Sequence, residues 1–352
     1  MIACLLKKQG GFNMKILMFS KREHELPAIS KWVEENGNNI QVDTIEEGLS
    51  AATVDKAKGY DGISIQQTNP IDETIVYEKL KEFGIKQIAS RTAGVDMIDL
   101  DQAIKNDLII TNVPAYSPNS VAELAVTQTM NLLRNMHLIN RNVNAGDFRW
   151  SANLIAREVR SITVGIVGTG KIGSTAARLF KGLGANVIAY DAYVNESLKD
   201  VLTYTDSLED LLKVADVVSL HTPLTEDTKH MINKDNLKLM KKGSFLVNAG
   251  RGGIINTDDL IDALENGIIC GAALDTFETE GTFLNQVIPH HDLTDPQIKK
   301  LLNMENVLFT HHIGYFTTTA VDNIVSISLD CVKDVLTTDN SANNVLPAMA
   351  LK

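Results

Sequence analysis

The chain alternates short apolar segments with longer amphipathic ones, and this alternation limits most strongly how it can fold. The first strand-like segments are 14–20, 61–65 and 86–90. The stretches between them predict helices at 22–36 and at 72–83, the second with Asp72 as its N-cap. Strands that alternate with helices are typical of a parallel sheet with helical crossovers. The pattern therefore predicts the α/β class.

A second alternating series follows the first, and the break near 114–120 predicts two domains. Its strand-like segments are 162–167, 185–190, 216–221, 244–250, 270–275 and 306–311. One long helical pattern, from about 120 to 144, precedes this series, and another follows at about 317–337. The last helix cannot form a domain alone, so we expect it to fold back on the first domain. A length of 352 residues fits two domains of about 100–200 residues each.

A glycine-rich turn links the first strand of the second series to its first helix. It reads GTGKIG, a G-x-G-x-x-G pattern made by Gly168, Gly170 and Gly173. Such glycines permit a tight bend, close approach of a pyrophosphate and close packing of helix on strand. The helix that follows points its free N–H groups at a phosphate. Taken alone, the pattern also fits a glycine turn that binds nothing.

An acidic residue at the end of the next strand makes the turn more specific. Asp191 lies 18 residues after Gly173, where a carboxylate accepts a hydrogen bond from a ribose 2′-hydroxyl. Strand, turn, helix, strand and acid thus occur in the order of a dinucleotide-binding unit. Since a carboxylate there would repel a 2′-phosphate, the sequence predicts NAD rather than NADP.

The composition disfavours several other classes of protein. Lysine plus arginine is 33 and aspartate plus glutamate is 44, and a net charge of −11 would repel nucleic acid. Cys4, Cys270 and Cys331 are too scattered for a disulfide framework or a zinc site, so no metal is expected. Cys270 lies in an apolar stretch and is expected to be buried. No apolar run is long enough for a membrane span, so no membrane partner is expected.

The first residues do not form a signal peptide, because their charges follow the apolar run instead of preceding it. We interpret residues 1–13 as a loose extension and Met14 as the start of the fold. With the cysteine pattern, this predicts a cytoplasmic protein.

Three polar residues near predicted strand ends are candidates for chemistry: Arg251, Glu280 and His312. Ligands bind at the carboxyl ends of parallel strands. Arginine suits a carboxylate because its fork makes paired hydrogen bonds, and histidine exchanges a proton near neutral pH. A glutamate beside that histidine would keep it protonated. From the residues alone, a surface arginine, a solvated glutamate and a polar strand end remain alternatives, and His311 competes with His312.

Seven motifs in fixed order resemble those of the D-2-hydroxyacid dehydrogenases. They are RTAGVD (91–96), NVPAYSP (112–118), VGTGKIG (167–173), HTP (221–223), NAGRG (248–252), LDTFETE (274–280) and HHIG (311–314). The resemblance runs from Met14 to about Leu336. Within the family the chain is most similar to bacterial D-lactate dehydrogenases, since it also has DFRW at 147–150 and a long segment between Glu280 and His312.

The resemblance implies two doubly wound parallel-sheet domains. A Rossmann NAD-binding domain at 118–314 would be inserted into a flavodoxin-like substrate domain made of 14–117 and 315–345. It also implies a homodimer formed through the 120–144 region. Residues 1–13 would lie outside both domains.

The resemblance also implies roles at the substrate. Arg251 would bind the carboxylate and carbonyl of a 2-oxo acid, and His312 would donate the proton with Glu280 as its partner. Backbone N–H groups around Ala93 and Gly94 would hold the same carboxylate. The substrate pocket would further include Tyr116 and Ile65. The alternative for Tyr116 is that its ring packs in the hinge and does not contact the substrate.

Further residues are implied at the cofactor. They are Lys171, Ile172, Thr222, Pro223, Thr228, Ala249, Gly250 and Asp275. Lys171 and Ile172 would lie along the pyrophosphate, Thr222, Pro223 and Thr228 would form part of the wall, and Asp275 would approach the nicotinamide carboxamide. A buried structural role is the alternative for Asp275.

Three positions depart from the family pattern. Many members have proline where this chain has His311 and alanine where it has Gly314, and glycine is expected to loosen the backbone next to His312. Ile65 stands where some lactate-preferring relatives have tyrosine, which changes the volume of the pocket. The predicted reaction is reversible reduction of pyruvate to D-lactate. A dehydrogenase for bulkier branched 2-oxo acids and, more remotely, an NAD-sensing scaffold are the alternatives.

Overall fold

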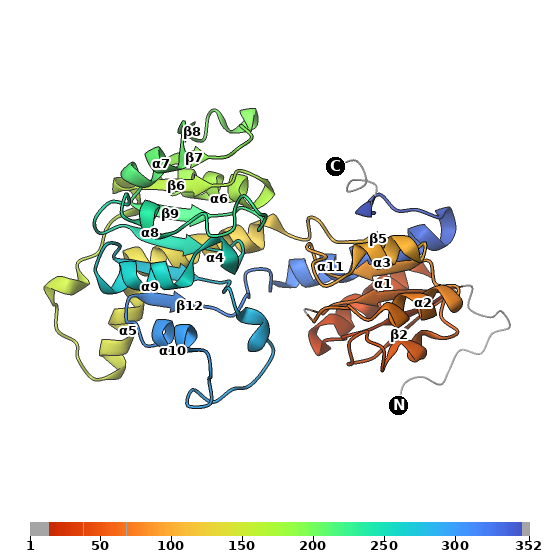
Figure 1. Cartoon of the computed structure of the whole chain (residues 1–352). Helices are drawn as coiled ribbons and strands as arrows, with labels where there is room; N and C mark the ends of the chain where they lie inside the picture. Colours follow the sequence, from red (N-terminus) through yellow and green to blue (C-terminus); the bar gives the residue numbers. More distant parts are fainter. Residues whose placement is uncertain (1–13, 38, 68, 347–352) are drawn as a thin grey trace. The chain divides into compact units, whose positions relative to one another are not determined.

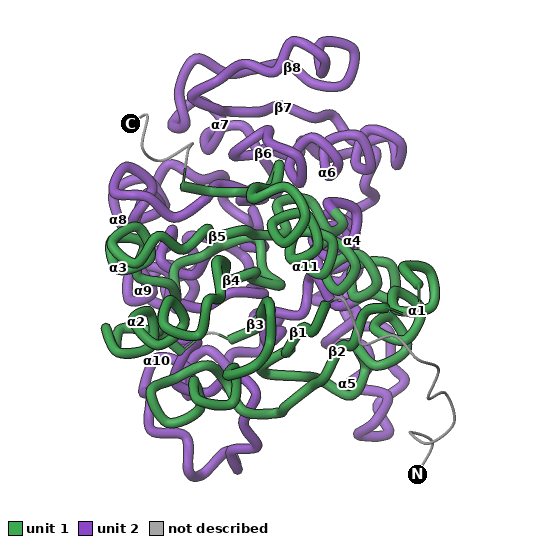
Figure 2. Tube along the Cα trace, turned by 90° about the vertical axis from the view of Figure 1, so that its right-hand side faces the viewer, with its two compact units in different colours: residues 1–117, 317–352 green, residues 118–316 purple. Residues whose placement is uncertain are grey.

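The computed structural model describes residues 14–37, 39–67 and 69–346. The prediction for residues 1–13 lies outside the described residues. The chain divides into two compact units, coloured separately in Figure 2. Unit 1 comprises residues 1–117 and 317–352, and unit 2 comprises residues 118–316. Unit 2 is thus inserted into unit 1.

Unit 1 is built on a five-stranded parallel sheet of order β2-β1-β3-β4-β5. Its strands are β1 (Met14–Met18), β2 (Ile40–Thr44), β3 (Gly62–Ile65), β4 (Gln87–Ser90) and β5 (Ile109–Thr111). This is the strand order of a flavodoxin-like sheet. The first strand begins at Met14, as predicted. The sequence pattern missed β2 and β5.

Helices cover both faces of this sheet (Figure 1). They are α1 (Leu26–Asn36), α2 (Thr74–Glu82), α3 (Leu100–Lys105) and α11 (Thr318–Thr338). One face packs on α1 and α11, and the other packs on α2 and α3. The final helix of the sequence therefore supplies part of the first unit's core. The predicted cap of α2 is wrong: the helix begins at Thr74, so its N-cap is Glu73, and Asp72 is one position too early.

Unit 2 contains a seven-stranded parallel sheet of order β12-β11-β10-β9-β6-β7-β8. Its strands are β6 (Thr163–Val167), β7 (Asn186–Tyr190), β8 (Thr203–Tyr204), β9 (Val217–Leu220), β10 (Phe245–Asn248), β11 (Gly271–Leu274) and β12 (Val307–Phe309). The chain winds outward from β6 in one direction and then from β9 in the other. This order is that of a Rossmann sheet, whose ligands bind where the winding reverses.

Helices also cover both faces of the second sheet. The helices of unit 2 are α4 (Pro118–Leu133), α5 (Met136–Asn144), α6 (Lys171–Gly182), α7 (Leu208–Val214), α8 (Lys234–Leu237), α9 (Thr257–Glu265) and α10 (Pro296–Leu302), of which α5 buries no residue. One core cluster joins α4 and α6 to one face, and another joins α7 to α10 to the opposite face. Within the described residues, no helix is long and apolar enough to cross a membrane.

Two predictions about unit 2 are wrong. The single helix expected at 120–144 is two helices, because Asn135 adopts a left-handed conformation (φ 53°) that ends α4 and starts α5. Cys270 is exposed, not buried, because it precedes β11 at the amino edge of the sheet. Cys331, on α11, is buried.

Candidate functional site

The glycine turn forms a tight link between β6 and α6. Gly168 has a positive φ of 90°, and Gly170 is the N-cap of α6. A Cβ atom on Gly173 would lie 1.8 Å from the carbonyl oxygen of Gly168, so only glycine permits this close packing of helix on turn. A Cβ on Gly170 would meet nothing within 4 Å, so the turn leaves open space in front of the helix.

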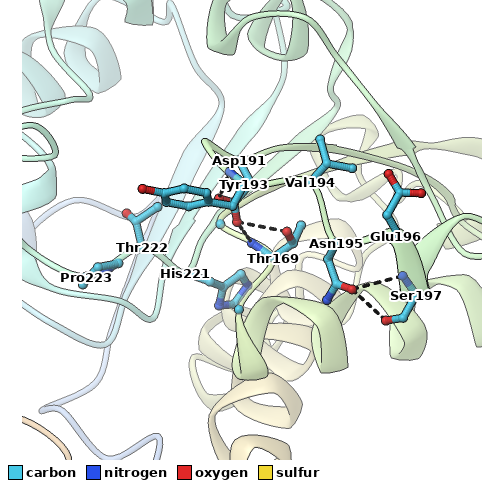
Figure 3. Close-up of a pocket in the computed structure, with 12 residues that line it drawn as sticks. Thr169, Asp191, Tyr193, Val194, Asn195, Glu196, Ser197, His221, Thr222 and Pro223 are labelled. Carbon is cyan, nitrogen blue, oxygen red and sulfur yellow. Dashed lines mark hydrogen bonds between the residues drawn. The ribbon is translucent and has the colours of Figure 1, made fainter. Parts of the chain in front are cut away.

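A pocket of about 700 Å³ opens beside this turn (Figure 3). The sequence predicted five of its lining residues: Gly168, Gly170, Asp191, Thr222 and Pro223. It missed seven others: Thr169, Tyr193, Val194, Asn195, Glu196, Ser197 and His221. The 193–197 loop directly follows Asp191, and His221 directly follows β9, so their positions after strand ends were the signal that could have found them.

The pocket has the features that NAD requires. The first turn of α6 has no side-chain cap, which leaves its N–H groups free to bind pyrophosphate. His221 Nδ1 and Thr222 Oγ1 are buried without a hydrogen-bond partner among the described atoms, so both can receive a polar ligand. Burial lowers the pKa of His221 to about 4, which keeps the ring neutral at pH 7. Gly168, Lys171 and Ile172 would hold the pyrophosphate.

The three candidate catalytic residues follow three adjacent strands. Arg251 comes three residues after β10, Glu280 lies beyond β11, and His312 comes three residues after β12. The loops that carry the first two are in backbone contact, since a Cβ on Gly252 would lie 2.0 Å from the carbonyl carbon of Phe277. All three therefore lie at the carboxyl edge of the same sheet.

His312 and Glu280 form a hydrogen-bonded pair. His312 Nδ1 lies 2.8 Å from Glu280 Oε1, and the side chains are 33 % and 22 % exposed. The other carboxylate oxygen of Glu280 accepts a hydrogen bond from the N–H of Phe277 at 3.0 Å, which fixes the carboxylate. His312 Nε2 has no partner among the described residues, so it is free to act on a ligand. His311 is exposed and has no such carboxylate partner within the described chain.

Arg251 carries a charge that the described residues leave unpaired. Its side chain makes one hydrogen bond, from Nη1 to the carbonyl oxygen of Gly250 at 3.1 Å. Within residues 14–37, 39–67 and 69–346 no carboxylate forms an ion pair with it. A half-buried guanidinium of this kind is suited to an anionic ligand.

Comparison with known proteins identifies the family. Residues 126–314 match the NAD-binding domain of the D-isomer specific 2-hydroxyacid dehydrogenases. The D-2-hydroxyacid dehydrogenase (NAD(+)) of Clostridioides difficile is 62% identical over 332 residues, which cover 94% of this chain and 100% of that protein. The chain belongs to the D-isomer specific 2-hydroxyacid dehydrogenase family.

Solved structures agree with this assignment. A D-lactate dehydrogenase from Sporolactobacillus sp. matches with a TM-score of 0.85 and 52% identity, over 94% of this chain and 98% of that one. The structure of D-2-hydroxyisocaproate dehydrogenase matches with a TM-score of 0.88 and 39% identity, over 94% and 99%. The predicted family, fold class, NAD cofactor and enzyme class are confirmed.

Asp275 holds the segment that carries His312 in this dehydrogenase. Asp275 is 2 % exposed, and its carboxylate accepts hydrogen bonds from Thr310 Oγ1 and from the N–H groups of Ile313 and Gly314. Its carbonyl oxygen accepts the N–H of His312, whose φ is 56°. The glycine at 314 therefore does not loosen the segment, because Asp275 binds the N–H groups of His312, Ile313 and Gly314 itself. An approach of Asp275 to the carboxamide stays a prediction.

The remaining predicted cofactor residues of the dehydrogenase lie near the pocket or shape its loops. Lys171 and Ile172 are the first residues of α6. The Thr228 hydroxyl donates to the carbonyl oxygen of Pro223 at 2.6 Å, which closes the loop after β9. Ala249 is buried, and the N–H of Gly250 donates to Asn248 Oδ1. Their contacts with cofactor stay predictions.

The predicted substrate residues lie in unit 1 of the dehydrogenase. Asn112 Nδ2 donates to the carbonyl oxygen of Ala93, and Thr92 Oγ1 donates to that of Gly94. The N–H groups of Ala93 and Gly94 donate to nothing within the described residues. Tyr116 accepts a hydrogen bond at its carbonyl oxygen from Asn323 Nδ2. Ile65 ends β3 and is fully buried in the core of unit 1.

Among the residues described, no cluster of three or more histidine, cysteine or acidic side chains could bind a metal ion.

Proposed function

We propose that this dehydrogenase reversibly reduces pyruvate to D-lactate with NADH. The observation that carries the proposal is the pairing of His312 Nδ1 with Glu280 Oε1 at 2.8 Å, at the same sheet edge as Arg251, which forms no ion pair within the described residues. His312 can donate a proton to a carbonyl oxygen, and Arg251 can bind a carboxylate. A 2-oxo acid has both groups on neighbouring carbons.

Each residue has a separate task. Arg251 binds the substrate carboxylate and orients the carbonyl. His312 donates the Nε2 proton to the carbonyl oxygen, while the Glu280 carboxylate stabilises the imidazolium that must be present beforehand. When bound, the reduced nicotinamide supplies the hydride. In lactate oxidation, neutral His312 accepts the hydroxyl proton through the same nitrogen.

The loop at Ala93 and Gly94 is proposed as a second contact for the carboxylate. The N–H groups of Ala93 and Gly94 share their peptide groups with the carbonyl oxygens of Thr92 and Ala93. Both of these oxygens accept hydrogen bonds within unit 1, so the peptide groups are fixed, whereas the two N–H groups donate to nothing among the described residues. Fixed N–H donors bind an anion at little cost in reorganisation. We accordingly propose Ala93 and Gly94 as the substrate contacts of unit 1, and we assign cofactor binding to unit 2.

Reduction of bulkier branched 2-oxo acids is the second candidate function. The relative with 62% identity is named a D-2-hydroxyacid dehydrogenase without restriction to lactate, and a solved relative acts on 2-hydroxyisocaproate by its name. The aliphatic Ile65 is a further reason to test larger substrates, although its place in the pocket stays a prediction.

Steady-state kinetics with NADH and a panel of 2-oxo acids decides between these functions. We expect the highest kcat/KM for pyruvate; a higher value for 2-oxoisocaproate would establish the second candidate. His312→Ala should abolish most turnover and leave NADH binding nearly unchanged. His311→Ala is the matched control and should keep the activity. An inactive protein that still binds NADH would favour the NAD-sensing alternative.

We also propose a homodimer in the cytoplasm. Support for the dimer comes from exposed apolar side chains on the segment that follows α5, where Phe148 is 75 % and Trp150 is 102 % exposed. The cytoplasmic location rests on the sequence argument from three scattered cysteines.

A further inference from the structure

Neighbouring groups of the chain bind both oxygens of the Asp191 carboxylate by hydrogen bonds. Its Oδ2 accepts hydrogen bonds from both the backbone N–H and the hydroxyl of Thr169, at 2.5 and 2.9 Å. Its Oδ1 accepts the N–H of Tyr193 at 2.9 Å. Figure 3 shows the Thr169 side chain directed at this carboxylate. Both oxygens are therefore fixed before any ligand arrives.

The hydrogen bonds continue past Thr169 to a residue that does not line the pocket. The Tyr204 hydroxyl donates to Thr169 Oγ1 at 2.9 Å and accepts the N–H of Asn195 at 3.0 Å. The donors run in one direction, from the Asn195 N–H through the two hydroxyls of Tyr204 and Thr169 to the Asp191 carboxylate. We name these three hydrogen bonds the Tyr204 relay.

The relay is set in well-packed surroundings. Thr169 is 2 % exposed, and the half-buried ring of Tyr204 packs on the core cluster that joins α6 to the sheet. Tyr204 belongs to β8, which has only two residues and pairs with β7 at the sheet edge. This short strand thus places the Tyr204 hydroxyl between the glycine turn and the loop after β7.

The hydrogen bonds from Thr169 and Tyr193 restrict what Asp191 can bind. A carboxylate has about four acceptor positions, and three are occupied, so the one that remains belongs to Oδ1. That position can accept a hydrogen bond from one hydroxyl group. A 2′-phosphate has no such proton at neutral pH and would require the carboxylate to turn away, which breaks the hydrogen bonds to Thr169.

We propose that Tyr204 and Thr169 are positioning residues that lock the Asp191 carboxylate and thereby set the preference for NADH over NADPH. This inference rests on the proposed contact of Asp191 with the adenosine ribose. A purely structural role would weaken the binding of both dinucleotides equally. A positioning role changes the ratio of the two dissociation constants.

The test is fluorescence titration of the full-length protein with NADH and with NADPH, which needs no turnover. Thr169→Val removes the hydroxyl and keeps the backbone bond, and Tyr204→Phe removes a single oxygen. Each should lower the ratio Kd(NADPH)/Kd(NADH) at least about threefold, the lower end of the effect of one hydrogen bond. Thr169→Ser retains the hydroxyl and should retain the ratio.

Two further variants separate the ways in which the inference can fail. Tyr60→Phe is the matched control, because it removes a tyrosine hydroxyl that donates to Asp43 in unit 1 at 2.8 Å, and it should leave the ratio unchanged. Asp191→Ala should lower the ratio at least as far as the relay variants. If Asp191→Ala lowers it and both relay variants do not, the relay is only structural. If Asp191→Ala leaves it unchanged, the ribose assignment itself is wrong and the inference fails with it. Thermal unfolding of each variant verifies that it is folded. If Thr169→Val does not fold, the ratio measured for Tyr204→Phe tests the inference by itself.

Discussion

The carboxylate of Glu280 next to His312 has a direct consequence for turnover. Glu280 Oε1 lies 2.8 Å from His312 Nδ1, so the carboxylate holds the ring and faces it with a negative charge. Glu280→Gln keeps the size of the side chain but removes that charge. The kcat/KM for pyruvate reduction should therefore fall at least about tenfold, or roughly 1.4 kcal/mol, with little change in the dissociation constant of NADH.

The matched control for this variant is Glu278→Gln. Glu278 is bonded to a different histidine, His230, at 2.6 Å, so Glu278→Gln should leave kcat/KM nearly unchanged. An unchanged kcat/KM in Glu280→Gln would show that the pair does not control proton donation. His311 would then have to be tested as the donor.

Arg251 offers a second residue-scale prediction. Arg251→Lys keeps the positive charge but loses the paired geometry of the guanidinium. KM for pyruvate should rise at least about tenfold, or roughly 1.4 kcal/mol, with little change in the dissociation constant of NADH. Substrate kinetics and NADH titration measure the two effects separately. An unchanged KM would remove Arg251 from the carboxylate site.

His221 makes the apo protein sensitive to acid. Its pKa is lowered to about 4 by burial, so the folded state binds its proton less readily than the unfolded state does. This contribution to the free energy of unfolding is present above about pH 6.5 and is lost as the pH falls toward 4; by pH 5 the loss is roughly 1–2 kcal/mol. Urea unfolding at pH 7 and pH 5 should show a smaller loss in His221→Asn. Equal losses in both proteins would contradict a buried neutral ring.

Residues with a fixed chemical task could be predicted from the sequence, while residues placed only by packing could not. Gly168, Gly173 and Asp191 occur at the spacing that a dinucleotide demands, and their geometry agrees with it. Thr169 and Tyr204 are 35 residues apart and meet only because β8 pairs with β7. No local pattern contains that contact.

At the scale of elements, the longest strands and helices were predictable because their patterns run over many residues. The helix at 171–182 was predicted with its observed bounds. β8 has two residues, too few for any alternation to show. The break between α4 and α5 was missed because the apolar periodicity continues across Asn135, and only the backbone conformation of that one residue ends the helix.

The break at Asn135 can be tested by stability. Asparagine tolerates the left-handed region, glycine adopts it freely, and a β-branched residue does not. Asn135→Gly should leave the free energy of unfolding within about 0.5 kcal/mol, whereas Asn135→Val should lower it by about 1–2 kcal/mol. Urea denaturation measures both. Equal stability of the two variants would mean that the helices are continuous in solution.

At the scale of the whole molecule, unit 1 is completed by the last helix of the sequence, which follows unit 2 along the chain. The helix α11 contributes Val325, Leu329 and Val332 to the core on one face of the first sheet. A hydroxyl of that helix, at Ser328, also bonds Ser64 of β3 at 2.8 Å. The lone final helix in the sequence indicated this arrangement, because a single amphipathic helix needs a partner to bury its apolar face.

An apolar surface of unit 2 lacks such a partner within the described chain. None of the residues of α5 is buried, and Phe148, Trp150 and Ile155 in the following segment are 75 %, 102 % and 79 % exposed. Exposed apolar side chains that gather on one segment indicate an interaction surface. A second copy of the chain would cover it symmetrically in a dimer, in which each copy uses the same surface.

Sedimentation velocity tests the dimer directly. The wild-type protein should sediment with the mass of two chains, and the double variant Phe148→Ser/Trp150→Ser should shift toward the mass of one, because the apolar area that stabilises association is removed. Val287→Ser is the matched control: Val287 is 100 % exposed on a loop of the same unit, and its loss should not change the mass. A wild-type protein that sediments as a monomer at micromolar concentration would contradict the proposal. A double variant that stays dimeric would place the interface on another surface.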